Sequence, residues 1–267
     1  MTVLSAGRDV AVTVTVTVGN DHVATVELCR PPNNTLDVAL VTAVADALES
    51  LDADETCRAV VLCAQGRHFC AGAQLGASAP GGGPIPMGYS NPLYDQARRL
   101  FATAVPIVAA VQGGAIGGGL GLALVADFRM TCTEARFSAN FAKLGFHPGF
   151  GLSVTLPALV GQQQAADLLY TGRRVGGEEA VRLGLCDRLV DAADLRAAAH
   201  GWAAEIATSA PLAVRAVRRT LRGDLAARAA AAMQREHQAQ KALRGTGDYT
   251  EGVAAYAERR PPHFTGH

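Results

Sequence analysis

The stretch IVAAVQGGAIGGGL, residues 107–120, joins a short apolar run to a loop made almost entirely of glycine and alanine. A continuous apolar run of this length predicts a strand that is covered on both faces, as in a parallel sheet. The glycines let another backbone or a ligand approach closely, and the apolar residues from 120 to about 125 predict a helix. Because a helix start leaves N–H groups without acceptors, this segment predicts amides that point at a ligand.

A second segment, residues 59–74, has the same design. Its apolar half, 59–64, predicts another buried strand, and Phe69-Cys70-Ala71-Gly72-Ala73-Gln74 supplies another loop of small residues. One amide from each loop, aimed at one point, would form an oxyanion hole that stabilises negative charge on a carbonyl oxygen. The alternative is that glycines 117–119 only permit a close crossing of helix and strand. The sequence contains no GxGxxG fingerprint followed by an acidic residue about 20 positions on, and no Gly-Lys-Ser/Thr triplet, so neither a dinucleotide site nor a P-loop is indicated.

Strands, loops and helices alternate along the first 190 residues, which predicts an α/β fold with crossovers. We expect strands at 10–18, 23–28 and 129–133, and helices at 36–51, 94–103, after 149 and at 162–170, with a lid or loop at 76–92. From residue 194 onward only helical patterns occur. We therefore divide the chain into an α/β core, 1–193, and a helical region, 194–267. We expect these helices to cover a surface, either that of the chain's own core or that of a second subunit.

Composition excludes several classes of function. The 267 residues are 49% hydrophobic and 18% charged, and 24 basic side chains balance 24 acidic ones. A formal net charge of +0 argues against nucleic-acid partners and anionic membranes. The six cysteines show no metal-site spacing and mostly sit in apolar runs, so we interpret them as buried free thiols of a cytoplasmic protein without structural metal. No apolar run reaches the roughly 20 residues that span a bilayer, and 1–8 does not resemble a secretory signal.

Several short motifs, in the same order along the chain, resemble the crotonase superfamily, also called the enoyl-CoA hydratase/isomerase family. They are Arg67–Ala73, Pro106–Gly113, Gly117–Gly119, Ala126–Arg129, Phe137-Ser138, Leu144-Gly145, Pro148–Gly151, Leu169–Gly172 and Glu251–Arg260.

The resemblance implies a spiral of ββα turns with a C-terminal helical region that trimerises, as a homotrimer or a dimer of trimers. It implies acyl-CoA thioester substrates, an enolate held by the amides of Ala73 and Gly118, and no cofactor beyond the coenzyme A of the substrate. It also implies a set of contacts to the substrate and its coenzyme A, made by Pro32, Asn33, Ala71, Gly72, Gln74, Gly117, Gly121, Asn140, Phe141, Tyr256 and Arg259.

The sequence departs from the family's hydratases at the two glutamates that orient water and move protons. Those positions are Gly121 and Phe141 here, and Gln74 replaces an acid that often follows the first loop. Since neither Gly121 nor Phe141 can take a proton, acid–base work must fall on another group or be absent. His147 lies beside the lost position and is the foremost candidate, ahead of Asn140 and His68.

The remaining arginine-rich helical segment contains Arg215, Arg218, Arg219 and Arg222. We interpret it as a solvated face or a subunit contact, and not as a phosphate site.

These observations leave three functions open. The first is an acyl-CoA enzyme of the hydratase/isomerase family that stabilises a thioester enolate but hydrates inefficiently. The second is a CoA-thioester hydrolase, decarboxylase or C–C bond-cleaving enzyme. The third is a trimer that binds acyl-CoA without catalysis.

Overall fold

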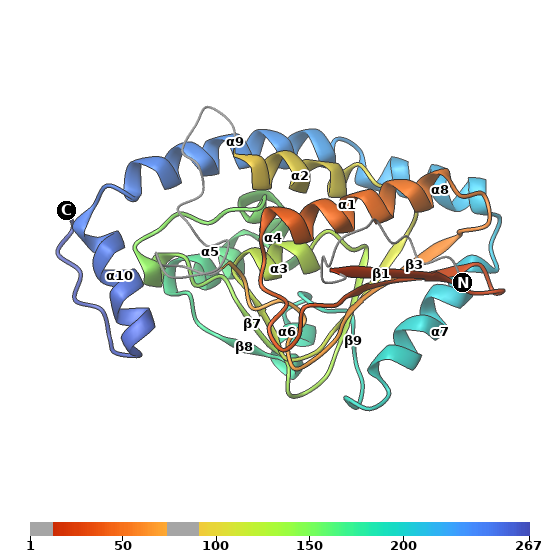
Figure 1. The fold of residues 1–267 in the computed structure, drawn as a ribbon, viewed down its shortest axis with the longest axis horizontal. Helices are drawn as coiled ribbons and strands as arrows, with labels where there is room; N and C mark the ends of the chain where they lie inside the picture. Colours follow the sequence, from red (N-terminus) through yellow and green to blue (C-terminus); the bar gives the residue numbers. More distant parts are fainter. Residues whose placement is uncertain (1–12, 74–90) are drawn as a thin grey trace, which may run out of the picture.

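The computed structural model describes residues 13–73 and 91–267, and within them two sheets lie among helices (Figure 1). The larger sheet has six strands in the order β1-β2-β3-β4-β6-β9, and the smaller has three in the order β5-β7-β8. The predicted α/β fold is confirmed.

The larger sheet starts with the predicted hairpin. β1 (Val14–Val18) pairs antiparallel with β2 (Val23–Leu28), and β2 then pairs in parallel with β3 (Ala59–Ala64). β4 (Ile107–Val111) is parallel to β3, and every residue of β3 and β4 is buried, as a strand covered on both faces must be. The sheet is completed by β6 (Phe128–Thr131) and β9 (Arg188–Leu189).

The first helices pack over this sheet and on each other. α1 (Val38–Ala53) begins two residues later than predicted, because the Asp37 carboxylate caps it by accepting from the Leu40 amide at 2.8 Å. α2 (Pro92–Phe101) packs on α1 and is capped by Asn91. The predicted lid falls almost entirely at 74–90, outside the described residues.

The smaller sheet begins within the glycine loop, and its helices come after it. The strands are β5 (Gly114–Ile116), β7 (Arg136–Ser138) and β8 (Val175–Gly176). The helices are α3 (Gly118–Ala123), the 3₁₀ turn η1 (Ala142–Leu144), α4 (Leu152–Val160), α5 (Gln162–Thr171) and α6 (Gly177–Arg182).

The chain after residue 194 is helical, as predicted. Its helices are α7 (Leu195–Ala207), α8 (Pro211–Arg222), α9 (Leu225–Leu243) and α10 (Gly247–Glu258). α7 covers β3 and β4, α9 runs beside α2 and α4, and α10 packs on η1 (Figure 1). Much of this region therefore covers the chain's own core, whereas its division as a domain and its trimerisation stay predictions.

The arginines of α8 correct our interpretation of that helix. Arg218 is buried, donates to Asp127 Oδ2 at 2.8 Å and reaches the Thr103 carbonyl oxygen. Arg222 donates to the Val125 carbonyl oxygen at 2.7 Å. A solvated face was the wrong interpretation for these two side chains, because they hold α8 on the core through the partly buried Asp127 carboxylate and through backbone carbonyls.

No helix in the two described ranges has the length and apolarity to cross a membrane. Within the same ranges, no group of three or more His, Cys, Asp or Glu side chains is placed to hold a metal ion.

Candidate active site

The two small-residue loops lie side by side because their backbones hydrogen bond to each other. The Cys70 amide donates to the Gly114 carbonyl oxygen at 3.0 Å, and the Ile116 amide donates to the Cys70 carbonyl oxygen at 3.0 Å. The first loop is held on its other side, where the Leu36 amide donates to the Gly72 carbonyl oxygen at 2.9 Å. Two segments about 45 residues apart in the chain thereby form one wall.

Glycine is required where these loops touch. Gly72 has φ of +85°, and a Cβ there would lie 2.6 Å from the Ile116 carbonyl oxygen. A Cβ on Gly119 would meet the Cys70 carbonyl oxygen. Any side chain at either position would force the backbones apart, so the glycines keep the two loops in register.

Cys70 and His68 belong to this scaffold. Complete burial raises the pKa of the Cys70 thiol to about 12, which keeps it un-ionised and unreactive at neutral pH. His68 Nδ1 accepts a hydrogen bond from the Gly114 amide at 2.9 Å, and partial burial together with Arg67 lowers the pKa of its imidazole. A neutral His68 that holds the second loop is thus a positioning residue.

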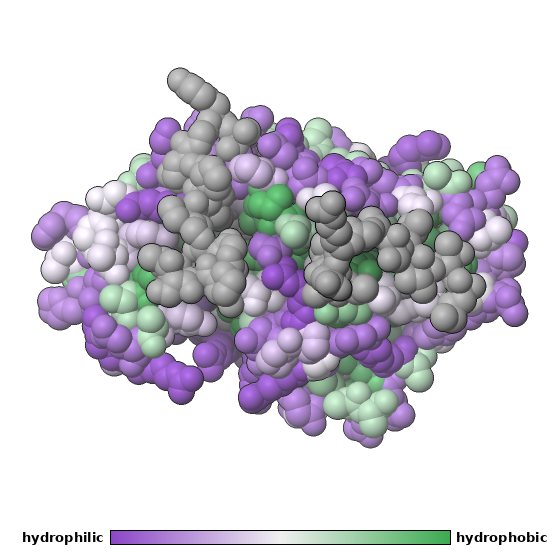
Figure 2. All heavy atoms as spheres, in the orientation of Figure 1, coloured by the Kyte–Doolittle hydropathy of each residue, from purple (hydrophilic) through white to green (hydrophobic). Residues whose placement is uncertain are grey.

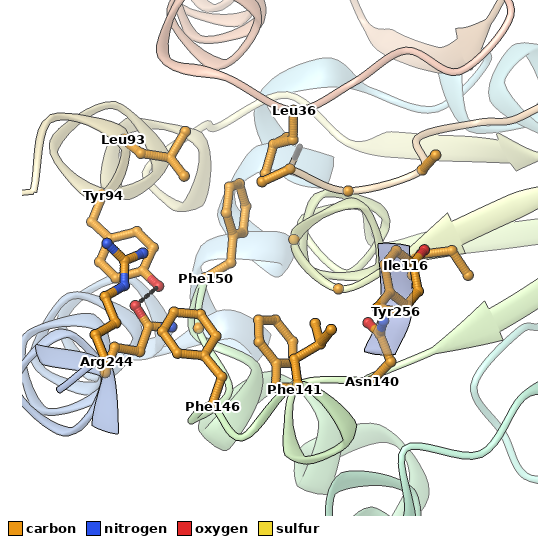
Figure 3. Close-up of a pocket in the computed structure, with 18 residues that line it drawn as sticks. Leu36, Leu93, Tyr94, Ile116, Asn140, Phe141, Phe146, Phe150, Arg244 and Tyr256 are labelled. Carbon is orange, nitrogen blue, oxygen red and sulfur yellow. Dashed lines mark hydrogen bonds between the residues drawn. The ribbon is translucent and has the colours of Figure 1, made fainter. Parts of the chain in front are cut away.

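A cavity lies against this wall, with about 680 Å³ of unfilled space when its opening to solvent is included (Figure 3). Figure 2 shows apolar side chains at the surface near the middle of one face of the molecule, surrounded by hydrophilic ones. The lining residues of the cavity come from both loops, α2, the η1 region, the segment before α4, α9 and α10. They are Leu36, Ala71, Gly72, Ala73, Leu93, Tyr94, Ile116, Gly117, Gly118, Asn140, Phe141, Leu144, Phe146, Gly149, Phe150, Gln240, Arg244 and Tyr256.

The two predicted amide donors both line this cavity. Ala73 ends the first loop, and Gly118 is the first residue of α3, where helix geometry leaves the amide without an intrahelical acceptor. No residue in the described part of the chain accepts a hydrogen bond from either amide. The arrangement can therefore offer two N–H groups to a ligand atom in the cavity.

The two positions of the missing glutamates differ. Phe141 is buried and its ring faces the second loop, with Cζ 3.6 Å from where a Cβ of Gly117 would lie. Gly121 does not line the cavity, because Phe150 covers it, and a Cβ on Gly121 would lie 2.7 Å from Phe150 Cβ. Both positions are thus occupied by an aromatic ring: Phe141 is itself the second position, and Phe150 packs over Gly121.

The wall opposite the glycine loops is built from side chains (Figure 3). The Tyr94 hydroxyl of α2 donates to Gln240 Oε1 of α9 at 3.0 Å, and Gln240 Nε2 donates to the carbonyl oxygens of His147 at 3.0 Å and Pro148 at 3.3 Å. Burial, and then the nearby Glu236 carboxylate, raises the pKa of the Tyr94 phenol, so it stays protonated. Arg244 places its guanidinium carbon 5.1 Å from the centre of the Phe146 ring.

His147 does not line the cavity, although the sequence made it the foremost acid–base candidate. Its Nδ1 donates to the Pro148 carbonyl oxygen at 2.7 Å, and its own carbonyl oxygen accepts from Gln240. The backbone of His147 thus supports the cavity wall by accepting a hydrogen bond from Gln240, whereas its imidazole does not line the cavity.

The other predicted contacts divide into two groups. Ala71, Gly72, Gly117, Asn140 and Tyr256 line the cavity together with the amide donors.

Pro32, Asn33 and Arg259 are exposed and lie outside the cavity lining. Asn33 nevertheless supports the first loop, because its carbonyl oxygen accepts from the Ala71 amide at 2.9 Å. Gln74 is outside the described residues.

Sequence reasoning missed Tyr94, Phe146, Phe150, Gln240 and Arg244 as lining residues. Tyr94 and Gln240 are 146 positions apart, and no motif joins them. The amphipathic pattern of α2 marks Tyr94 as inward-facing, but that signal does not separate a core residue from a cavity wall.

Comparison with known proteins agrees with this architecture. A family profile described as enoyl-CoA hydratase/isomerase matches residues 19–267. The crystal structure of an enoyl-CoA hydratase/isomerase from Pseudoalteromonas atlantica superimposes with a TM-score of 0.84 at 33% identity, covering 95% of this chain and 100% of that one. An enoyl-CoA hydratase structure from Mycobacterium avium gives a TM-score of 0.81 at 28% identity, covering 95% and 99%.

A carnitinyl-CoA dehydratase from Salmonella arizonae is 34% identical over 258 residues, which is 93% of this chain and 97% of that protein. The fold and the paired loops define an acyl-CoA enzyme with the crotonase fold. The chain belongs to the enoyl-CoA hydratase/isomerase family.

Proposed function

We propose that this protein binds an acyl-CoA thioester with its carbonyl oxygen at the amides of Ala73 and Gly118 and stabilises the enolate there. The acyl group enters the cavity between Phe141, Phe150 and Leu36. One observation carries the proposal: among the described residues, the cavity lining includes both amide-bearing residues but no Asp, Glu or His side chain. Such a site stabilises negative charge without supplying a carboxylate base.

This arrangement favours C–C bond cleavage, including decarboxylation, over hydration. Hydration needs a water held at the β-carbon and a proton delivered to the α-carbon, so two positioned groups act together. In a decarboxylation, the electron pair of the breaking C–C bond enters the enolate, carbon dioxide leaves, and a proton from water then adds to the α-carbon. That path needs the oxyanion donors but no base, and the rings of Phe141 and Phe150 keep the cavity dry.

A second candidate, binding without turnover, draws on the same lack of acid–base side chains. Turnover of a panel of acyl-CoA, α-carboxyacyl-CoA (malonyl-CoA type) and β-ketoacyl-CoA thioesters, with mass spectrometry of the products, separates the two. We expect cleavage of a C–C bond in at least one thioester, and crotonyl-CoA hydration at least about 10⁴-fold slower than in a two-glutamate family member assayed alongside. Hydration at that member's rate would contradict the proposal, and binding with no turnover would favour the second candidate.

The assembly we propose is a homotrimer or a dimer of trimers. Leu212 and Leu221 of α8 are 81% and 82% exposed, which supports a further apolar contact for this helix. A stable monomer in light scattering at micromolar concentration would contradict it. Five of the six cysteines are buried free thiols, which supports a reducing compartment and the cytoplasm as the location.

A further inference from the structure

Among the described residues that line the cavity, one side chain is positively charged and none is negatively charged. That side chain is Arg244, which follows α9 directly. Figure 3 shows Arg244, Tyr94 and Phe146 on one side of the cavity, and Ile116, Asn140 and Tyr256 on the other, with Phe141, Phe150 and Leu36 between them. The charge therefore lies at one end of a space whose other described lining residues are uncharged.

Exposure tells which end receives the acyl group. Tyr256 is 55% exposed and Ala73 is also exposed, whereas Tyr94 and Gln240 are only 8% and 3% exposed. Coenzyme A is large and carries phosphates, so it belongs at the open end by Tyr256. An acyl chain whose carbonyl oxygen is at Ala73 and Gly118 then extends past Phe141 and Phe150 toward Tyr94 and Arg244.

The polar groups beside Arg244 are already used within the protein. Tyr94 donates to Gln240 Oε1 at 3.0 Å, and Gln240 donates to two backbone carbonyl oxygens. The buried Glu236 carboxylate, two turns earlier on α9, accepts from the Gly151 amide at 2.8 Å and from the Ser153 amide and hydroxyl. These groups fix the wall, and Arg244 is the charged side chain beside them among the described lining residues.

Arg244 is suited to a carboxylate. Its contact with the Phe146 ring, at 5.1 Å, orients the guanidinium plane. A guanidinium presents its N–H donors in a fork that matches both oxygens of a carboxylate. In an apolar cavity such a charge-assisted pair is stronger than it would be in water.

We propose that the acyl group of the substrate carries a second carboxylate at its far end, which Arg244 binds. The ligand class is thus an ω-carboxyacyl-CoA, the thioester of a dicarboxylic acid. This inference rests on the proposed acyl-CoA function and adds the identity of the acyl terminus.

The test measures binding of matched thioester pairs to the full-length protein by calorimetry. Glutaryl-CoA is compared with pentanoyl-CoA, adipoyl-CoA with hexanoyl-CoA, and free coenzyme A serves as the reference. The variants are Arg244→Met, which keeps the length and removes the charge, and Arg244→Lys, which keeps the charge without the fork. Arg235→Met is the matched control, because Arg235 is exposed on the same helix and does not line the cavity.

We expect the wild-type protein and Arg235→Met to bind the better carboxylated thioester about 10- to 100-fold more tightly than its neutral partner. Arg244→Met abolishes that preference without weakening the neutral thioesters, and Arg244→Lys retains part of it. Circular dichroism and thermal unfolding confirm that each variant is folded.

Three other results would overturn the inference. Equal binding within every pair shows that the acyl end does not recognise a carboxylate. A loss of affinity in Arg244→Met that is the same for free coenzyme A and for all thioesters shows that Arg244 contacts a coenzyme A phosphate. If neither member of any pair binds more tightly than free coenzyme A, the proposed function fails and the inference fails with it.

Discussion

The two walls of the cavity are built from different materials. The wall of the glycine loops is backbone: amides and carbonyls of residues 70–73 and 114–118, joined by hydrogen bonds of about 3 Å. The opposite wall is made of side chains, with Tyr94 from α2, Gln240 from α9 and Phe141 from the η1 region as its main members (Figure 3). The first wall offers two amide donors, and the second decides what shape and charge of acyl group fits beside them.

This difference separates two properties of the site: the backbone wall carries the amide donors, and the side-chain wall sets which acyl group fits. A backbone amide cannot be exchanged by a point substitution other than to proline, and the glycines that hold the loops tolerate no side chain. The side-chain wall can change one residue at a time without disturbing the amides. In this chain the aromatic residues Phe141 and Phe150 have filled that wall where acid–base chemistry needs carboxylates.

The largest expected effect comes from removing one amide of the backbone wall. Gly118→Pro deletes the N–H donor at the first position of α3, a helix position where proline is tolerated. We expect kcat on the best thioester of the panel to fall about 10²- to 10³-fold, since one oxyanion donor is lost. Steady-state kinetics and thioester affinity measure the effect.

Gly118→Ala is the matched control, because it adds a Cβ at the same place and keeps the amide. In both variants that Cβ meets the side chain of Leu36, so Leu36→Ala is combined with each to relieve the contact. Equal kcat in the proline and alanine variants, with both folded, would remove Gly118 from the oxyanion hole.

The contrast between the walls also explains what the sequence could predict of the fold. The strands at 59–64 and 107–111 were predicted with their observed bounds, because each is a buried apolar run that ends at a small-residue loop. The helix predicted at 36 begins at Val38, since the Asp37 cap fixes its start. The contacts of Arg218 and Arg222 were not predictable, because a helical arginine pattern does not reveal that the fold brings the Asp127 carboxylate next to both side chains.

For the site, the sequence located the backbone wall and only part of the other. Loop composition pointed to the two loops, and the family resemblance pointed to the amides of Ala73 and Gly118 within them; both residues line one cavity. Tyr94, Gln240 and Arg244 meet only through tertiary packing of α9 on α2 and leave no local signal. His147 was chosen by its position beside Phe141 in the chain, and chain distance does not report the direction of a side chain.

A smaller effect is expected from the link that joins α2 to α9 within the side-chain wall. Tyr94→Phe removes the hydroxyl that donates to the buried Gln240 Oε1, leaving that oxygen without its partner. We expect the free energy of unfolding to fall by about 1–3 kcal/mol in urea denaturation. Tyr170→Phe, at a side chain that is 79% exposed, is the control and should change nothing. An unchanged stability for Tyr94→Phe would show that the Tyr94–Gln240 hydrogen bond does not contribute to holding α2 on α9.

The smallest effect is expected at His147. Its imidazole is directed to the Pro148 carbonyl oxygen and does not line the cavity, while the contact with Gln240 uses the His147 backbone, which substitution leaves in place. His147→Ala should therefore change kcat/KM by less than about twofold, the range typical of side chains outside a site. The pH dependence of kcat should also keep its shape between pH 5 and 8. A fall of more than tenfold, together with the loss of one limb of the profile, would instead make the imidazole the acid–base group of the side-chain wall.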